Sequence, residues 1–355
     1  MVETILVFPA GLPDAQRFRT QAQARGARVI GASSLGFDAA AADYEAWETL
    51  PYVHEDGFAQ ALGEAVRRCG VQAVFSPHEV VSGVLADVLE TVAPGVRLIA
   101  PNPALATERD YEALTARAED CESRWFALSD GQPPLTTIER AGLLRLLDTI
   151  PGMSDLDKAA ALIGAMRHAP EGDVVEIGSW WGRSAALLVM LARRWDIGPV
   201  LCVDPWANSH LDQGVAVLDQ ASARISAEAA FRIFQINLAP LAGGRLNYLR
   251  APSTEAAQAY RPGLTVRTDT FGTTAYEGRI SLLHIDGNHA YESVAADAEA
   301  WVPRVKPGGW IVFDDYVWAF GDGPRRVGDA WLERLGDKVA LAFVIGTALF
   351  VKLAP

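Results

Sequence analysis

Short apolar runs alternate with helix-like segments along most of this chain, and this alternation limits the folds that it can adopt. Near the N-terminus the apolar runs are "TILVFPA", "RVIGASS", "QAVFSPH" and "VRLIAPNP", and segments such as "GFAQALGEAVRRCG" separate them. Uninterrupted apolar runs are typical of strands buried on both faces, because helices cover both sides of a parallel sheet. The sequence therefore predicts an α/β fold built on parallel sheets.

The chain is long enough for two such units. A single hydrophobic core rarely grows beyond about 250–300 residues, and this chain has 355 residues. The strand-like alternation is interrupted between about 106 and 150, where "TTIERAGLLRLLDTI" has apolar residues at helical spacing. We predict a Rossmann-like N-terminal domain over 1–105, a helical connector over 106–150 and a second Rossmann-like domain over 151–355.

Charge, cysteine content and the terminal segments exclude several classes of protein. The formal net charge is −13, and so acidic a chain is a poor general binder of nucleic acid or of anionic membranes. Three cysteines without metal or disulfide spacing fit a reducing compartment. The start "MVETILVFPAG" lacks the basic region of a signal peptide, and "VALAFVIGTALFVK" is too short for a membrane helix. We expect a cytoplasmic protein.

The N-terminal domain resembles the domain that precedes the catalytic part of ATP-grasp enzymes. The resemblance lies in "ILVFPAG", "RVIGASS", "LPYVHEDGFAQAL" and "VFSPHE", and no ATP-grasp domain follows them. Two hypotheses remain for this domain. It is either a spacer or homo-oligomerisation domain, or a surface that helps to bind substrate through His78 and Glu79 at a strand end.

A glycine loop follows the first strand-like run of the second domain. "DVVEIG" reads as a buried strand, "GSWWG" as a loop, and "RSAALLVMLARRW" as the start of a helix. Glycines 178 and 182 permit close backbone approach to a ligand, and the helix start offers unpaired N–H groups. The spacing E-x-G-x-x-x-G is not the dinucleotide fingerprint. Glu176 would repel a diphosphate, but it would tolerate an amino-acid ammonium.

The next strand-like run narrows the choice of ligand. "PVLCVDPW" places Asp204 at a strand end, 22 residues after Gly182, where a carboxylate can accept both hydroxyls of a ribose. S-adenosylmethionine has a ribose and an ammonium but no phosphate. Glu176, Gly178, Gly182 and Asp204 together resemble the class I S-adenosylmethionine-dependent methyltransferases, which implies a Rossmann-like sheet with an antiparallel final strand. The predicted cofactor-binding residues are Glu176, Gly178, Ser179, Gly182, Ser184, Asp204, Trp206 and Ser253.

Two of these cofactor residues have equally plausible structural roles. The ring of Trp206 could stack on adenine or sugar, but core packing accounts for it equally well. The hydroxyl of Ser253 could reach the adenine edge or belong to an ordinary turn.

Three carboxylates lie at the ends of two later strand-like runs. "ISLLHIDGNHAYESVAADAEAWVPRVKPGGWIVFDDY" reads as strand, loop, helix, turn and strand, with Asp286 ending the first strand and Asp314 and Asp315 the second. Parallel strands joined by a helix often lie side by side. Three carboxylates at one edge repel one another unless protons or a cation offset them, and oxygen ligands suit Mg²⁺. The alternatives are a plain border of the cofactor pocket or solvated, turn-capping side chains.

His289, three residues after Asp286, can accept a proton from a substrate hydroxyl when its ring is neutral. The whole stretch resembles the metal-dependent small-molecule O-methyltransferases, including those that methylate sugars of macrolides and related natural products. In that resemblance Asp286, Asp314 and Asp315 fall on metal ligands. This chain has Asn288 where the family often has an acidic residue, so we assign the role of base to His289, with Asp286 beside it. The alternative is that His289 is only a surface residue of the loop.

The sequence thus predicts an O-methyltransferase that acts on a sugar or another polyhydroxylated small molecule, using S-adenosylmethionine and Mg²⁺. One alternative is a metal-independent methyltransferase with another acceptor. The other is a non-catalytic protein that binds S-adenosylmethionine. The glycine-containing segment "VWAFGDGPRRVGDAW" is a candidate cover for the substrate.

Overall fold

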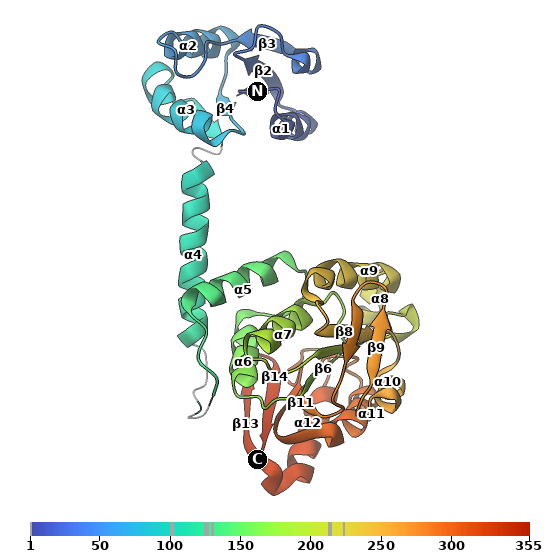
Figure 1. The fold of residues 1–355 in the computed structure, drawn as a ribbon. Helices are drawn as coiled ribbons and strands as arrows, with labels where there is room; N and C mark the ends of the chain where they lie inside the picture. The colour runs from blue at the N-terminus through green and yellow to red at the C-terminus, as the bar shows by residue number, and fades with distance from the viewer. Residues whose placement is uncertain (1, 100–102, 124–127, 129–130, 212–214, 223) are drawn as a thin grey trace. The chain divides into compact units, whose positions relative to one another are not determined.

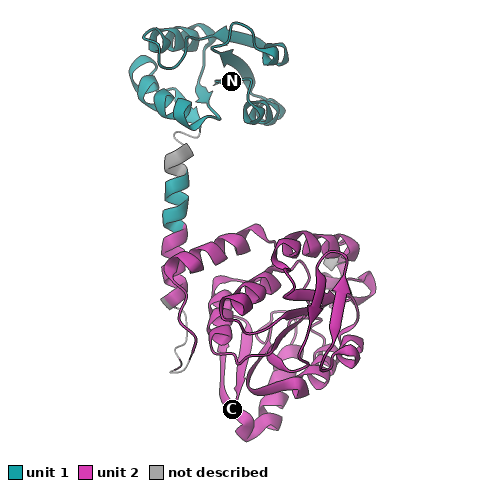
Figure 2. Ribbon diagram, in the orientation of Figure 1, with its two compact units in different colours: residues 1–113 teal, residues 114–355 magenta. Residues whose placement is uncertain are grey.

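The computed structural model describes residues 2–99, 103–123, 128, 131–211, 215–222 and 224–355. Their contacts divide the chain into two compact units, Met1–Ala113 and Leu114–Pro355 (Figures 1 and 2). Each unit has its own sheet, as the alternation of strand-like and helix-like segments predicted. None of the helices that the structure describes is both long and apolar enough to cross a membrane.

Unit 1 is built on a five-stranded parallel sheet in the order β3-β2-β1-β4-β5. Ile5 and Val7 pack on the side of α1, whereas Leu6 packs on the side of α2 and α3, so β1 is buried on both faces. His78 and Glu79 lie at the start of α3, just beyond β4. The elements are β1 (Thr4–Val7), α1 (Pro13–Ala24), β2 (Arg28–Ser33), η1 (Ala39–Asp43), β3 (Ala46–Thr49), α2 (Phe58–Cys69), β4 (Ala73–Phe75), α3 (Glu79–Val92) and β5 (Arg97–Ile99).

The predicted connector contains two helices, α4 (Pro103–Ser123) and α5 (Thr137–Thr149), and the boundary between the units falls inside α4. The second half of α4 belongs to the core of unit 2, since Ala118 and Cys121 are fully buried there. Arg140 on α5 is also buried, and it donates to the carbonyl oxygen of Ala118 and pairs with Glu122. The second half of α4 and α5 therefore pack in the same hydrophobic core.

A shortened chain that begins at Leu114 should therefore keep the fold of unit 2, whereas one that begins at Thr136 should be destabilised. The second chain loses the three buried core residues Ala118, Cys121 and Leu135. It also removes the carbonyl oxygens of Ala118 and Leu135 and the carboxylate of Glu122 as partners of Arg140. Leaving the buried guanidinium of Arg140 without these partners costs about 1–3 kcal/mol, so we expect a melting temperature lower by roughly 5 °C. Thermal unfolding of both chains by circular dichroism measures this. Equal melting temperatures would contradict the assignment of α4 to this core.

Unit 2 has a seven-stranded sheet in the order β13-β14-β12-β11-β6-β7-β8. The neighbouring strands β12, β11, β6, β7 and β8 are parallel to one another. β14 runs antiparallel to both β12 and β13. The predicted antiparallel final strand is thus confirmed, and the turn before it contains Gly346 at φ 58°. The strands are β6 (Asp173–Ile177), β7 (Val200–Val203), β8 (Leu246–Leu249), β11 (Ile280–Ile285), β12 (Val305–Phe313), β13 (Val339–Ile345) and β14 (Ala348–Leu353), with β9 (Thr265–Thr268) and β10 (Gly272–Ala275) as a separate antiparallel pair.

Helices cover both faces of this sheet (Figure 1). Side chains of α5, α6, α7 and α9 pack on the face that includes Val174, and those of α10, α11 and α12 pack on the face that includes Val175. The remaining helical elements of unit 2 are α6 (Leu156–Arg167), α7 (Arg183–Arg194), η2 (Asn208–His210), α8 (Ala216–Ser222), α9 (Ala227–Leu238), η3 (Ala239–Leu241), α10 (Ser253–Ala259), α11 (Tyr291–Trp301), η4 (Val302–Arg304), α12 (Gly323–Leu335) and η5 (Gly336–Lys338).

Candidate active site

The polar residues singled out in the sequence gather at the carboxyl edge of the unit 2 sheet. β6 lies between β7 and β11, and β12 lies on the other side of β11. Residues that directly follow these strands include Gly178, Asp204, Asp286 and Asp314. Loops at this edge of a parallel sheet are where α/β proteins bind their ligands.

The glycine loop crosses close to the end of β11. Gly178 has φ 83°, and a Cβ atom there would lie 2.0 Å from the carbonyl oxygen of Asp286. Gly182 has φ 87° at the N-terminus of α7, where a Cβ would press on Leu238 at 3.0 Å. Both positions require glycine, because side chains rarely adopt such angles and no space exists for them. Ser179 and Ser184 are buried next to these glycines.

Asp204 fastens the glycine loop to the end of β7. One carboxylate oxygen accepts the backbone N–H of Trp180 at 3.0 Å, and the other accepts that of Trp206 at 2.7 Å. Trp180 and Trp206 have φ 44° and 39°, left-handed conformations that cost energy and need such support. Burial raises the pKa of Asp204 to about 6, against the effect of these two hydrogen bonds.

Two predicted cofactor residues are engaged in packing. The ring of Trp206 is 1 % exposed and packs against Phe234, with ring centres 4.5 Å apart. The Ser253 hydroxyl accepts the indole N–H of Trp301 at 2.8 Å. Core packing accounts for these two side chains, although the backbone of Trp206 still supports Asp204.

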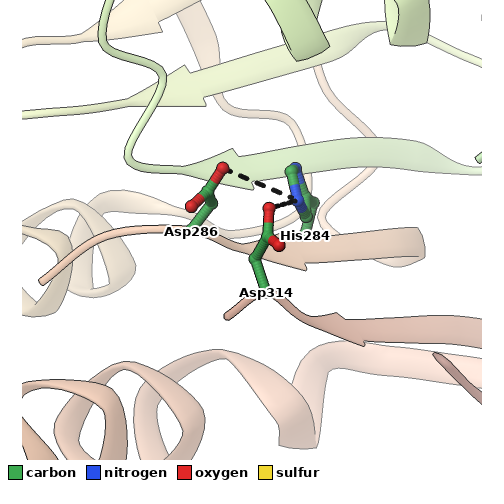
Figure 3. Close-up of side chains that lie close together, drawn as sticks. All are labelled: His284, Asp286 and Asp314. Carbon is green, nitrogen blue, oxygen red and sulfur yellow. Dashed lines mark hydrogen bonds and ion pairs between the residues drawn. The ribbon is translucent and has the colours of Figure 1, made fainter. Parts of the chain in front are cut away.

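A row of charged side chains lies at this edge of the sheet, and Figure 3 shows three of them, His284, Asp286 and Asp314. His284 is fully buried, with Nδ1 3.1 Å from Glu176 Oε1 and Nε2 3.2 Å from Asp314 Oδ2. Its Nε2 lies 4.0 Å from Asp286 Oδ2. Lys158 of α6 is in contact with Asp314 Oδ2, and its Nζ lies 3.8 Å from Asp286 Oδ2.

Lys158 and His284 were missed at the level of the sequence. Side chains alternate along a strand, so Glu176, His284 and Asp314 point to the same face of neighbouring strands. The available signals were a histidine inside the apolar run "ISLLHI" and a lysine inside "DKAAALIGAM". Neither signal identifies its partner.

Mutual contact sets the ionisation of this row. Burial alone would lower the pKa of His284, but hydrogen bonds with Asp314 and Glu176 raise it to about 10. Burial opposes ionisation of Asp314, yet His284 and Lys158 hold the pKa of its carboxyl well below the usual range. Burial and the neighbouring Asp314 charge raise the pKa of Asp286. The contacts with Lys158 and His284 therefore stabilise the ionised carboxylate of Asp314.

The three predicted carboxylates separate into two groups that share Asp286. His284, Asp286 and Asp314 form the inner set, and Asp286, His289 and Asp315 form the outer set; within each set the ligand atoms lie within 4.8 Å of one another. In the outer set His289 Nε2 lies 2.8 Å from Asp315 Oδ2, and both side chains are partly exposed.

Only the outer set fits a divalent cation. Its donors are two carboxylates and an imidazole at a partly exposed position, a chemistry that such ions accept. In the inner set the lysine ammonium already contacts Asp314, and hydrogen bonds with Asp314 and Glu176 raise the pKa of His284.

The segment after β12 encloses His289 from a second side. The ring of Trp318 lies against that of His289, with centres 4.5 Å apart. A Cβ at Gly323 would lie 2.2 Å from the carbonyl oxygen of His289, so this segment packs directly on the loop. Asn288 accepts the N–H of Ala290 at 2.9 Å, and this bond orders the loop between them.

Comparisons with known proteins agree with this fold. Residues 175–316 match the family model described as "Methyltransferase domain". The chain is 26% identical over 205 residues to 8-demethyl-8-(2,3-dimethoxy-alpha-L-rhamnosyl)-tetracenomycin-C 4'-O-methyltransferase of Streptomyces olivaceus, covering 57% of this chain and 74% of that protein.

Two solved structures are also similar. The O-methyltransferase NovP is 15% identical, with 71% of this chain and 99% of that one covered and a TM-score of 0.41. MycE methyltransferase from the mycinamycin biosynthetic pathway, solved with Mg and SAH, is 15% identical, with 86% and 64% covered and a TM-score of 0.30. Residues 175–316, which include the glycine loop and the inner and outer sets, are thus similar to a methyltransferase domain.

Proposed function

We propose that the chain transfers the methyl group of S-adenosylmethionine to a hydroxyl of a small molecule, a sugar or another polyhydroxylated metabolite. The observation behind this proposal is the outer set of Asp286, His289 and Asp315, which abuts the glycine loop at Gly178. A proton acceptor and cation ligands beside a cofactor loop suit the deprotonation and methylation of a hydroxyl. The curated relative, which acts on a rhamnosyl group, supports this acceptor class.

The residues of the glycine loop fit the cofactor. The start of α7 offers backbone N–H groups, and Gly178 and Gly182 keep the loop free of side chains. Glu176 Oε2 is buried and has no hydrogen-bond partner among the residues that the structure describes, so it can accept an ammonium. Each Asp204 oxygen accepts one backbone N–H, and a carboxylate oxygen can accept a second hydrogen. Asp204 therefore retains capacity for the two ribose hydroxyls.

We expect S-adenosylmethionine binding to weaken as the pH falls through about 6, because burial raises the pKa of Asp204 to about 6. A protonated carboxyl loses its charge and part of its acceptor capacity. The dissociation constant at pH 5 should be up to roughly tenfold larger than at pH 7.5, since one pH unit below the pKa leaves about a tenth of the carboxyls ionised. Calorimetric titration across this range measures it.

Asp204→Asn is the matched control, since it preserves the shape but cannot titrate. Its affinity should be weak and independent of pH between 5 and 7.5. Wild-type affinity that does not change over the same range would argue against Asp204 as the ribose acceptor.

At the acceptor side, His289 takes the proton of the hydroxyl while Asp315 orients the imidazole from 2.8 Å. The carboxylates of Asp286 and Asp315 are the proposed ligands of Mg²⁺, which when bound lowers the pKa of a coordinated hydroxyl. Asp314 was also predicted as a ligand, but its carboxylate faces Lys158 and His284. Trp318 beside His289 offers a flat apolar surface to the acceptor.

A metal-independent methyltransferase is the second candidate, because Lys158 and His284 already offset the inner carboxylates. A chelator of divalent cations should abolish turnover by the metal-dependent enzyme and leave turnover by the metal-independent enzyme unchanged.

A further inference from the structure

Lys158 occupies an unusual position for a lysine. It lies in the first turn of α6, where its N–H donates to the capping Asp155 at 2.7 Å, and it is 5 % exposed. The residues that follow it on α6 are buried apolar residues of the core. An ammonium in such surroundings is costly unless opposite charges compensate it. The ammonium of Lys158 therefore needs opposite charges in contact with it.

The compensating groups are two of the three carboxylates at the end of β11 and β12. Lys158 contacts Asp314 Oδ2, and its Nζ lies 3.8 Å from Asp286 Oδ2. These are the positions at which a divalent ion in the inner set would find its ligands, since the donor atoms of His284, Asp286 and Asp314 lie within 4.8 Å of one another. The ammonium thus stands between carboxylates that would otherwise attract an ion.

Asp314, the partner of Lys158, also accepts a hydrogen bond from the backbone of Asp315. Asp314 Oδ1 accepts the N–H of Asp315 at 2.9 Å, and Asp315 has φ 49°. This left-handed conformation is rare for a residue other than glycine, and the hydrogen bond to Asp314 supports it. The carboxylate of Asp315 then lies 2.8 Å from His289. Lys158 is therefore connected through Asp314 to the outer set.

We infer that Lys158 is a positioning residue whose ammonium is the resident cation of the inner set, so that no divalent ion binds at the inner set. This inference deepens the proposed function and rests on it for the role of the outer set. It assigns to Asp314 a partner within the protein rather than a metal. Asp286, Asp314 and Asp315 together would therefore bind one ammonium, that of Lys158, and one divalent ion.

The inference is tested with Mn²⁺ as the probe, by counting bound ions per chain with calorimetry and electron paramagnetic resonance. Lys158→Ala removes the charge and leaves space beside Asp286 and Asp314, so this variant should bind one more Mn²⁺ than the wild type. Lys338→Ala, which removes an exposed lysine of η5, is the matched control and should bind as the wild type does. No gain in a folded Lys158→Ala protein overturns the inference.

The count also separates this inference from the proposed cation at the outer set. One ion in the wild type and two in Lys158→Ala support both. None in the wild type and one in Lys158→Ala support the role of Lys158 and contradict the outer-set cation.

If Lys158→Ala does not fold, a second variant, Lys158→Met, tests the same inference. Lys158→Met keeps most of the volume and removes the positive charge 3.8 Å from Asp286. Loss of a like charge at this range should tighten binding of Mn²⁺ at the outer set by at least about tenfold. Unchanged affinity in this variant would overturn the inference.

Discussion

His289→Ala should lower turnover by roughly 10²–10⁴-fold, the usual contribution of general acid–base catalysis. The physical reason is that Asp286 and Asp315, the other members of the outer set, are the proposed cation ligands, which leaves the imidazole of that set as the base. Asn288 has an amide side chain that already accepts the N–H of Ala290, and an amide is not a useful base at neutral pH. Turnover measured at saturating S-adenosylmethionine and acceptor gives this ratio, and affinity for the cofactor should barely change.

The pH dependence provides a second measure of the same role. Only the neutral ring accepts a proton, so the wild-type rate should rise with pH, and this step should be missing in His289→Ala. His54→Ala is the control, because His54 is an exposed histidine of unit 1. Near-normal turnover of His289→Ala with an unchanged profile would assign the proton to another group.

His289 also lies within reach of a cation in the outer set, and the two roles have different signatures. As a base, its removal leaves the affinity for Mn²⁺ unchanged. As a ligand, its removal weakens that affinity and shifts the metal concentration needed for half-maximal rate. The comparison therefore distinguishes a proton acceptor from a metal ligand at the same position.

Removal of divalent cations should abolish turnover, and Mg²⁺ should restore it. The outer set holds two carboxylates near the proposed acceptor position, and without a cation the hydroxyl keeps its high pKa. Asp315→Asn should raise the Mg²⁺ concentration needed for half-maximal rate. Activity assayed across a Mg²⁺ titration after chelation measures both effects.

Asp314→Asn, next in the chain, should behave differently. Its carboxylate is buried against Lys158 and His284, and removing one partner of a buried ion pair costs about 3–5 kcal/mol. We expect a clear loss of thermal stability. Full activity in excess chelator would favour the metal-independent candidate, in which the charges of Lys158 and His284 are the only compensation.

The fold class and the edge at which the site lies follow from local patterns in the sequence. Apolar runs such as "DVVEI" and "ISLLHI" are strands because only a sheet covered on both faces buries them completely. The glycines at 178 and 182 were identifiable because they lie between a strand-like and a helix-like run, and the structure gives both of them a positive φ. Asp204, Asp286 and Asp314 follow strands, and parallel strands end at one edge. These properties depend on neighbours in the chain, so the sequence determines them by itself.

Which side chains meet at that edge was decided by the tertiary structure alone. Lys158 contacts Asp314 across 156 positions of the chain, and no periodicity links an α6 lysine to the end of β12. The left-handed turn at Asp315 sends two adjacent carboxylates to different partners, Asp314 to Lys158 and Asp315 to His289. A pattern of residue types assigns Asp314 and Asp315 the same role. Only packing in three dimensions, which fixes distance and direction, separates the residue held by an ammonium from the residue available to a cation.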